Sequence, residues 1–263
     1  MLIDFHTHAF PERIATGTID KLAKASGGIT PQTKGTLASL KEEMAKDGVD
    51  IAVALSISTN PTQQTNVNNF AAELNKDPAI VAFGSVHPEA ENALEELDRI
   101  HDMGLKGVKF HPEYQGFYPD EERMKPIYRK ISSLGLVTLF HAGIDPAFTP
   151  PYRSVPSHIL GALKWFDTPV VAAHWGSLGC SEEVLSKLCG ENIWFDLSYG
   201  HSIITKDTAQ AIVDKHGTDK LLFGSDLPWH RPSWEMQLIK ALDISQDDLD
   251  KICYKNAQKL LNL

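Results

Sequence analysis

Eight short apolar runs recur along the 263-residue chain, and stretches with helical periodicity lie between them. The runs are rich in Val, Ile and Leu on both faces, which is typical of parallel strands covered by helices. We predict strands at residues 2–6, 50–55, 79–85, 105–110, 136–141, 169–173, 192–197 and 220–225. The count and the spacing, which averages about 30 residues, predict an α/β fold of the closed (β/α)8 TIM-barrel type, forming one domain over residues 1–263.

Helices are expected between these strands. The candidates are residues 37–46, 66–75, 90–101, 121–133, 181–188, 206–215 and 233–242, with a final helix over 247–263. Residues 14–35 are loosely patterned and rich in Gly and Thr, so we interpret them as a short insertion after the first strand. Residues 144–156 carry four prolines directly after His141. This predicts a stiffened loop that either roofs a pocket or forms a plain surface connection.

Composition narrows the classes of function. The net charge of −9 and the pI near 5.6 argue against nucleic acid as the main partner, because nucleic-acid binders usually show a basic surface. No apolar run approaches the roughly 18 residues of a membrane span, and Asp4 interrupts any signal-peptide core. We therefore expect a cytoplasmic protein without a membrane or nucleic-acid partner, and a homodimer stays open.

The three cysteines, Cys180, Cys189 and Cys253, are odd in number and lack the C-x-x-C spacing. This pattern favours inert, buried thiols over a disulfide framework or a thiolate zinc site.

Several predicted strands end in a residue that can bind metal or move protons. The first ends in His6 and His8. Residues two apart in a strand point to the same side, so these two can hold one metal ion between them. The later strand ends carry Lys109, His141, His174 and Asp226. Since strand-to-helix loops gather at the carboxyl ends of such a barrel, the six residues are expected to converge on one mouth.

Imidazole nitrogens and a carboxylate suit a borderline divalent cation, and we expect Zn2+, as one ion or two. The metal would lower the pKa of a bound water toward neutrality. Asp226 would accept the proton as hydroxide attacks, and His174 would orient or polarise the substrate, which makes them the candidate catalytic residues. Lys109 leaves three alternatives open: it pairs with an anionic substrate, bridges two metals after carboxylation, or points outward.

Side chains in the predicted loops at the same edge are candidates for contact with a small-molecule substrate. Arg153 or Arg231 could hold a substrate carboxylate through two hydrogen bonds, although a solvated arginine is the commoner outcome. Trp229 and Tyr114 either line the pocket or pack the loops onto the barrel. Three further histidines are more readily explained as loop residues, namely His87, His111 and His201.

These motifs resemble those of the amidohydrolase superfamily over nearly the whole chain. Residues 4–8 (Asp-Phe-His-Thr-His) are similar to its first-strand metal motif, and residues 223–229 (Phe-Gly-Ser-Asp-Leu-Pro-Trp) are similar to its eighth-strand aspartate segment. Residues 107–112 (Gly-Val-Lys-Phe-His-Pro) and 256–261 (Asn-Ala-Gln-Lys-Leu-Leu) resemble the branch called amidohydrolase-related, or amidohydrolase 2.

The resemblance implies both a ligand set and two chemistries. In the branch's pattern, one zinc would be held by His6, His8, His141 and Asp226. His174 would be the nearby catalytic histidine, and Lys109 is similar to the strand-four lysine that bridges metals in dihydroorotase-like relatives. The branch includes hydrolases and also decarboxylases that resemble aminocarboxymuconate semialdehyde decarboxylase.

This chain departs from the decarboxylase pattern because it is shorter and has His174-Trp-Gly where those enzymes have a glycine-rich turn. The leading prediction is therefore a metal-dependent hydrolase of a small amide, ester or lactone. The alternative is a carboxy-lyase acting on an unsaturated or aromatic acid. A barrel that keeps metal only for stability is the non-enzyme alternative.

Overall fold

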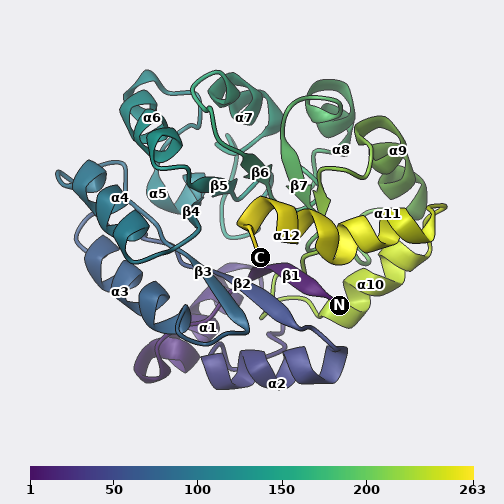
Figure 1. The fold of residues 1–263 in the computed structure, drawn as a ribbon, viewed down its shortest axis with the longest axis horizontal. Coiled ribbons are helices and arrows are strands. Elements are labelled where there is room, and N and C mark those ends of the chain that lie inside the picture. Colours follow the sequence, from purple (N-terminus) through teal and green to yellow (C-terminus); the bar gives the residue numbers. More distant parts are fainter.

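The computed structural model describes residues 1–263, with eight strands alternating with helices around a central barrel (Figure 1). The strands are β1 (Ile3–Thr7), β2 (Ile51–Leu55), β3 (Ile80–Phe83), β4 (Gly107–Phe110), β5 (Val137–Phe140), β6 (Val170–Ala172), β7 (Trp194–Asp196) and β8 (Leu221–Leu222). Each overlaps one predicted strand, and all neighbouring pairs are parallel. The predicted α/β barrel is confirmed.

Backbone hydrogen bonds close the strands into one ring. Regular pairing runs through β1 to β3 and through β4 to β8. At the first seam between these groups, the Lys109 amide donates to the Gly84 carbonyl at 2.8 Å. At the second seam, the Phe5 amide donates to the Phe223 carbonyl at 2.8 Å. Because both seams are bridged, the barrel leaves no unpaired sheet edge.

Helices surround this barrel. They are α1 (Glu12–Ala25), α2 (Leu37–Asp47), α3 (Gln64–Leu74), α4 (Ala93–Asp102), α5 (Pro112–Gln115), α6 (Lys125–Ser133), α7 (Pro156–Leu163), α8 (Ser181–Glu183), α9 (Lys206–His216), α10 (Pro232–Lys240), α11 (Gln246–Asp250) and α12 (Asn256–Leu261). The predicted segment 181–188 divides into α8 and a π-helical turn, and the predicted final helix divides into α11, a π-helical turn and α12.

Apart from the four-residue α5, two helices depart from the sequence-based interpretation. Residues 12–25, which overlap the predicted insertion at 14–35, form α1; Ala15 and Ile19 are buried on one face, but Thr16, Gly17 and Thr18 between them are poor helix formers and made the segment resemble a loop. Helix α7 follows directly on the proline-rich loop and starts with Pro156, a residue well suited to the first turn of a helix. Its eight residues are too few to give a clear helical period.

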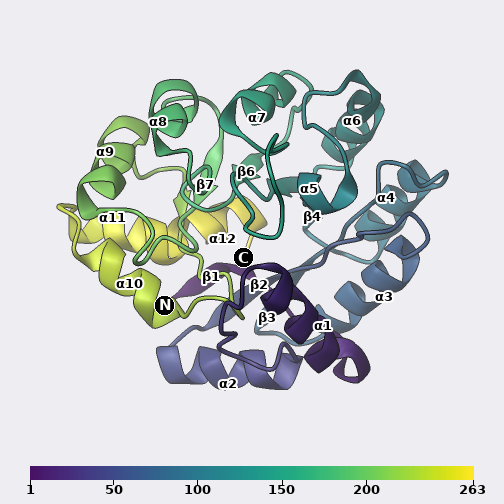
Figure 2. The same cartoon turned by 180° about the vertical axis from the view of Figure 1, so that it is seen from behind.

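The amino-terminal end of the barrel is closed by the last helix. Ala257 and Leu261 of α12 belong to the same apolar cluster as the residues that fill the barrel interior, such as Phe5, Phe83 and Leu139. In Figure 1, α12 lies across the front of the strands, and Figure 2 shows it behind them. Access to the interior is therefore left to the opposite, carboxyl-terminal end of the strands.

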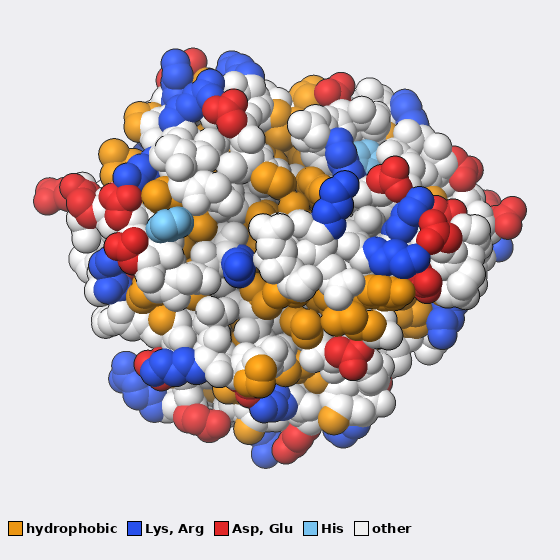
Figure 3. Space-filling model, in the orientation of Figure 1, with side chains coloured by type: hydrophobic (Ala, Val, Ile, Leu, Met, Phe, Trp, Pro, Cys, Tyr) orange, Lys and Arg blue, Asp and Glu red, His pale blue; other side chains and the backbone are white.

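The outer surface shows mixed charge on the face that carries α12. Acidic and basic side chains alternate around its rim, and no continuous basic patch forms there (Figure 3). None of the helices combines the length and apolar character that crossing a bilayer requires.

Candidate metal centre

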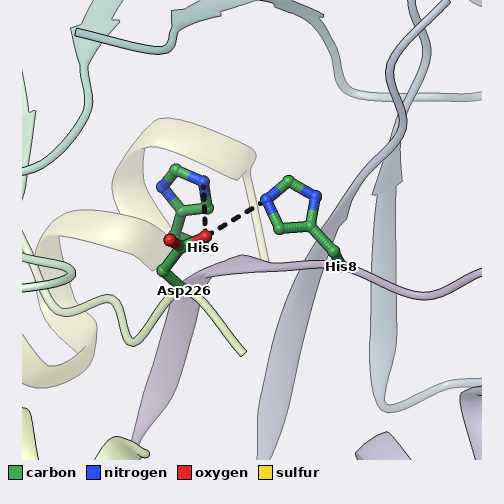
Figure 4. A group of neighbouring side chains, drawn as sticks. All are labelled: His6, His8 and Asp226. Atoms are coloured by element: carbon green, nitrogen blue, oxygen red, sulfur yellow. Dashed lines mark ion pairs between the residues drawn. The ribbon is translucent and has the colours of Figure 1, made fainter. Parts of the chain in front are cut away.

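His6 and His8 lie at the carboxyl end of β1 and face Asp226, which follows β8 (Figure 4). Asp226 Oδ1 lies 3.4 Å from His6 Nε2 and 3.2 Å from His8 Nε2. Each of the three side chains offers a donor atom close enough to the others to share one ion. Two imidazoles and a carboxylate are a donor set that zinc and similar divalent cations favour.

The backbone at two strand ends is held in an uncommon conformation. Asp226 has φ of 71° and His174 has φ of 58°, in the left-handed region that non-glycine residues rarely adopt. Such a conformation costs of order 1 kcal/mol or more, and it persists only where the surrounding structure enforces it. Four other non-glycine residues share this conformation, namely Trp175, Tyr199, Ser202 and Asn262, so it accompanies the site without marking it alone.

Asp196, at the end of β7, orients His6. Its Oδ2 lies 2.8 Å from His6 Nδ1, and its Oδ1 accepts a hydrogen bond from the His174 amide at 3.1 Å. With Nδ1 donating to Asp196, His6 keeps the Nε2 lone pair for the side that faces Asp226. Asp196 is not among the predicted site residues, although residues 193–196 (Ile-Trp-Phe-Asp) also end an apolar run with a carboxylate.

His174 and His141 meet at the same mouth. His174 Nε2 lies 3.1 Å from His141 Nδ1, and His174 Nδ1 lies 2.8 Å from Ser198 Oγ. The other nitrogen of His141, Nε2, is buried without a hydrogen-bond partner. A buried polar atom without a partner is unfavourable, so a ligand to this nitrogen fits the site. The assignment of His141 as a metal ligand stays a prediction.

Burial keeps these imidazoles neutral. Desolvation is the largest cause that lowers the pKa of His6, His141 and His174 well below the usual histidine value. A neutral imidazole has the free lone pair that coordination requires. Burial also raises the pKa of Asp226, and the hydrogen bond with His8 opposes that shift.

Lys109 points into the barrel. Its side chain is only 1% exposed, and Nζ lies 3.3 Å from His6 Nε2. The predicted alternative of an outward-pointing lysine is therefore wrong. Burial lowers the pKa of Lys109 to about 8, so a fraction of the amine is neutral near pH 7. Pairing with an anion and carboxylation both stay open.

Two further groups of side chains lie beside this centre. In the first, His6, His174 and Asp196, the carboxylate already accepts hydrogen bonds from His6 Nδ1 and the His174 amide. The second consists of His111, His141 and Asp145. His111 Nε2 is 3.2 Å from Asp145 Oδ2, but the rings of His111 and His141 stack at 4.0 Å with only 9° between their planes. Nitrogen lone pairs lie in the ring plane, so two parallel stacked rings cannot both point at one ion. This arrangement favours the group of His6, His8 and Asp226 as the primary metal site.

All six predicted metal-site residues line one cavity of about 1010 Å³, as do Tyr114 and Trp229. His111, which was favoured as a loop residue, and Asp145 also line it. Asp145 lies in the proline-rich segment 144–156, so the predicted alternative in which that loop borders a pocket agrees with the structure.

The two predicted substrate-binding arginines are not among the cavity-lining residues. Arg231 lies 3.2 Å from the Glu43 carboxylate and donates to Gln32 at 3.0 Å. The Arg153 guanidinium lies over the Tyr118 ring, 5.7 Å from its centre. Each arginine is therefore engaged outside the cavity.

Several solved structures share the fold. An uncharacterized TIM-barrel protein from Bordetella bronchiseptica is 19% identical, with a TM-score of 0.78 over 99% of this chain and 98% of that one. A 2,6-dihydroxybenzoate decarboxylase in complex with 2,6-dihydroxybenzoate is 17% identical, with a TM-score of 0.75 over 100% and 99%. A dihydroxybenzoic acid decarboxylase from Polaromonas, with bound manganese and 2-nitroresorcinol, is 16% identical, with a TM-score of 0.73 over 100% and 97%.

Sequence comparison gives the family. No curated protein matches the chain. The model of the Amidohydrolase family, Amidohydro_2, matches residues 3–263, which is nearly the entire barrel together with its strand-end histidines and aspartate. The chain therefore belongs to the amidohydrolase family.

Proposed function

We propose that the protein is a metal-dependent hydrolase of a small amide, ester or lactone. The observation that supports this most strongly is the placement of Asp226 Oδ1 within 3.4 Å of the Nε2 atoms of both His6 and His8. A divalent cation held there, for which zinc is our choice, supplies Lewis acidity that makes water a stronger acid and draws electrons from a carbonyl group.

The residues around this position have separate tasks. Water adds to the substrate carbonyl carbon while Asp226 takes its proton, and Asp226 returns that proton to the amine or alcohol that leaves. Burial raises the pKa of Asp226, so its carboxylate is a better base than an exposed one. His174, held through Nδ1 by Ser198, orients the substrate. Lys109, a buried amine beside His6, stabilises negative charge that develops on the substrate.

The test of this assignment is Asp226→Asn in metal-loaded protein. We expect turnover of the amide, ester or lactone found in a substrate panel to fall by about a hundredfold or more, because general-base catalysis is removed. Metal content is measured in parallel. The matched control is Asp102→Asn, an equal charge change at an exposed position on α4, which we expect to leave turnover unchanged. Unchanged turnover in Asp226→Asn with metal retained removes the proposed role.

Non-oxidative decarboxylation is the second candidate. Three fold relatives carry the name of dihydroxybenzoate decarboxylases, and one was solved in complex with 2,6-dihydroxybenzoate. Within this chain, the buried amine of Lys109 is a suitable partner for a substrate carboxylate at the reacting end of the cavity. Carbon dioxide release from carboxylated aromatics, without hydrolysis of any amide, ester or lactone, would favour this candidate over the first.

A further inference from the structure

The cavity extends from the buried metal centre to the surface between α1 and α3. Figure 2 shows α1 lying over β2 and β3, on the side of α3. We call the outer part of the cavity the distal arm, defined by its residues Arg13, Gly17, Lys21, Leu22, Val67 and Phe70. A volume of about 1010 Å³ lies at the upper end of the range for sites that enclose drug-sized ligands. A substrate of one small ring would leave the distal arm unfilled.

Helix α1 presents one face to the distal arm. Residues four apart lie above one another on a helix, so Arg13, Gly17 and Lys21 form one row. The neighbouring row, also part of the cavity wall, consists of Ile14, Thr18 and Leu22. One row of the wall therefore has a cation on either side of a gap at Gly17, and the other row supplies the apolar side chains of Ile14 and Leu22.

Gly17 has no structural reason to be a glycine. It lies inside α1, where glycine lowers helix stability by about 0.5–1 kcal/mol relative to alanine. A Cβ added at this position would meet no atom within 4 Å, and its φ is not in the left-handed region. Neither packing nor backbone conformation requires the missing side chain. Its absence does keep the middle of the distal arm open.

The distal arm is also positive in an acidic protein. The chain has 34 acidic and 25 basic residues, yet the only carboxylates among the cavity-lining residues are Asp145 and Asp226, both buried near the metal centre. Arg13 and Lys21 are exposed cavity-lining residues, and neither is paired with a carboxylate of the protein. These two cations therefore border the outer part of a channel that ends at the reacting group.

We propose that the distal arm binds the far end of an elongated substrate, with an apolar body passing over Gly17 and a terminal carboxylate held by Arg13 or Lys21. The proposal rests on the proposed function, because the metal centre marks where the reacting group lies. It adds the substrate class: an amide, ester or lactone that continues into a chain or ring system ending in a carboxylate. An arginine in this position can hold that carboxylate through two parallel hydrogen bonds.

Binding of dicarboxylates tests the distal arm without requiring turnover. Sebacate and decanoate have equal chain length but differ in the second carboxylate, and both are titrated into metal-loaded protein by calorimetry. We expect sebacate to bind about tenfold more tightly, since a hydrogen bond to a charged group contributes about 1.5 kcal/mol or more. The preference is expected to shrink as salt is added, because the cations are exposed. Succinate is too short to reach from the metal centre to the cations of the distal arm, so its second carboxylate is expected to give no increase in affinity over decanoate.

Variants of α1 locate the contact. The double variant Arg13→Gln/Lys21→Gln is expected to lose the preference for sebacate over decanoate. Gly17→Leu fills the channel and is expected to weaken sebacate binding about tenfold. The control is Thr16→Leu, which places the same side chain one position away, at an exposed residue outside the cavity wall. Circular dichroism verifies that both leucine variants fold, and leucine is the better helix former at either position.

The outcomes separate the two proposals. Equal affinity for sebacate and decanoate in the wild type, or equal affinity for sebacate in Gly17→Leu and Thr16→Leu, overturns the distal arm as a carboxylate site. If the protein prefers sebacate but hydrolyses nothing in the panel, the proposed carboxylate site in the distal arm stands and the proposed hydrolysis is wrong. If the protein hydrolyses a panel substrate but shows no preference for sebacate, the proposed hydrolysis stands and the carboxylate site is wrong.

Discussion

Replacing Asp196 by asparagine tests whether the proposed metal centre depends on the carboxylate that holds His6 through Nδ1. Asp196 accepts hydrogen bonds from His6 Nδ1 at 2.8 Å and from the backbone amides of His174 and Ser198 at 3.1 and 3.2 Å. An asparagine of the same size has one oxygen and one NH2 group. In either orientation, the NH2 group would face a donor, so at least one hydrogen bond is lost.

The size of the effect follows from that loss. Partners that orient a metal-binding histidine typically contribute 10- to 100-fold in metal affinity, or about 1.4–2.7 kcal/mol. A buried donor left without a partner also destabilises the fold by about 1–3 kcal/mol. We therefore expect Asp196→Asn to raise the zinc Kd about 10- to 100-fold and to lower the free energy of unfolding of the metal-free protein. The Kd is measured by competition with a chromophoric chelator.

The control separates orientation from charge. Asp102→Asn removes the same charge from an exposed position on α4 and is expected to leave the zinc Kd unchanged. A zinc Kd for Asp196→Asn within twofold of the wild-type value would refute the reasoning, because it would mean that His6 needs no partner at Nδ1 to present Nε2.

Three further predictions concern metal, thiols and packing. Removing metal with a chelator is expected to lower the midpoint of thermal unfolding by several degrees, since a ligand at a hundredfold excess over its Kd stabilises the native state by about 2.7 kcal/mol; superimposable melting curves would argue against a metal site. Burial raises the pKa of the Cys189 and Cys253 thiols to about 11. At pH 8, iodoacetamide should therefore alkylate them about a hundredfold more slowly than a free cysteine, and the rate should rise as the pH approaches 11. An alkylation rate equal to that of a cysteine in a model peptide would contradict this. Gly107→Ala should lower the free energy of unfolding by about 1–3 kcal/mol in urea titrations, because the new Cβ would lie 2.5 Å from the Val137 carbonyl oxygen. Gly17→Ala should raise it, because the new Cβ meets no atom within 4 Å and alanine is the better helix former. Similar stabilities for the two variants would contradict this expected difference.

The barrel was predictable from sequence because its strands are buried on both faces and read as continuous apolar runs. The strand-end residues were predictable for the same reason: a His or Asp that ends such a run must lie at the carboxyl edge. This logic places His6, His8, His174 and Asp226 in one cavity without any knowledge of side-chain conformation.

What could not be predicted depends on contacts between distant segments. Arg231 follows β8 in a loop at the cavity end of the barrel, as predicted, but its guanidinium pairs with Glu43 on α2 and lies outside the cavity. The proline-rich loop does border the cavity, but nothing in its sequence singled out Asp145 as a side chain that enters it. Helix α1 was missed because Thr16, Gly17 and Thr18 are poor helix formers, so the segment was interpreted as part of a Gly/Thr-rich insertion although Ala15 and Ile19 are buried four residues apart.

The closure of the barrel has a consequence for biosynthesis. The hydrogen bonds between Asp4 and Ser225 join positions 221 residues apart, and the last helix then covers the interior. During translation, the first strand must wait unpaired on one side until almost the entire polypeptide has left the ribosome. Binding of the proposed metal would therefore report the completion of folding, and a nascent chain arrested before Ser225 should have no such affinity.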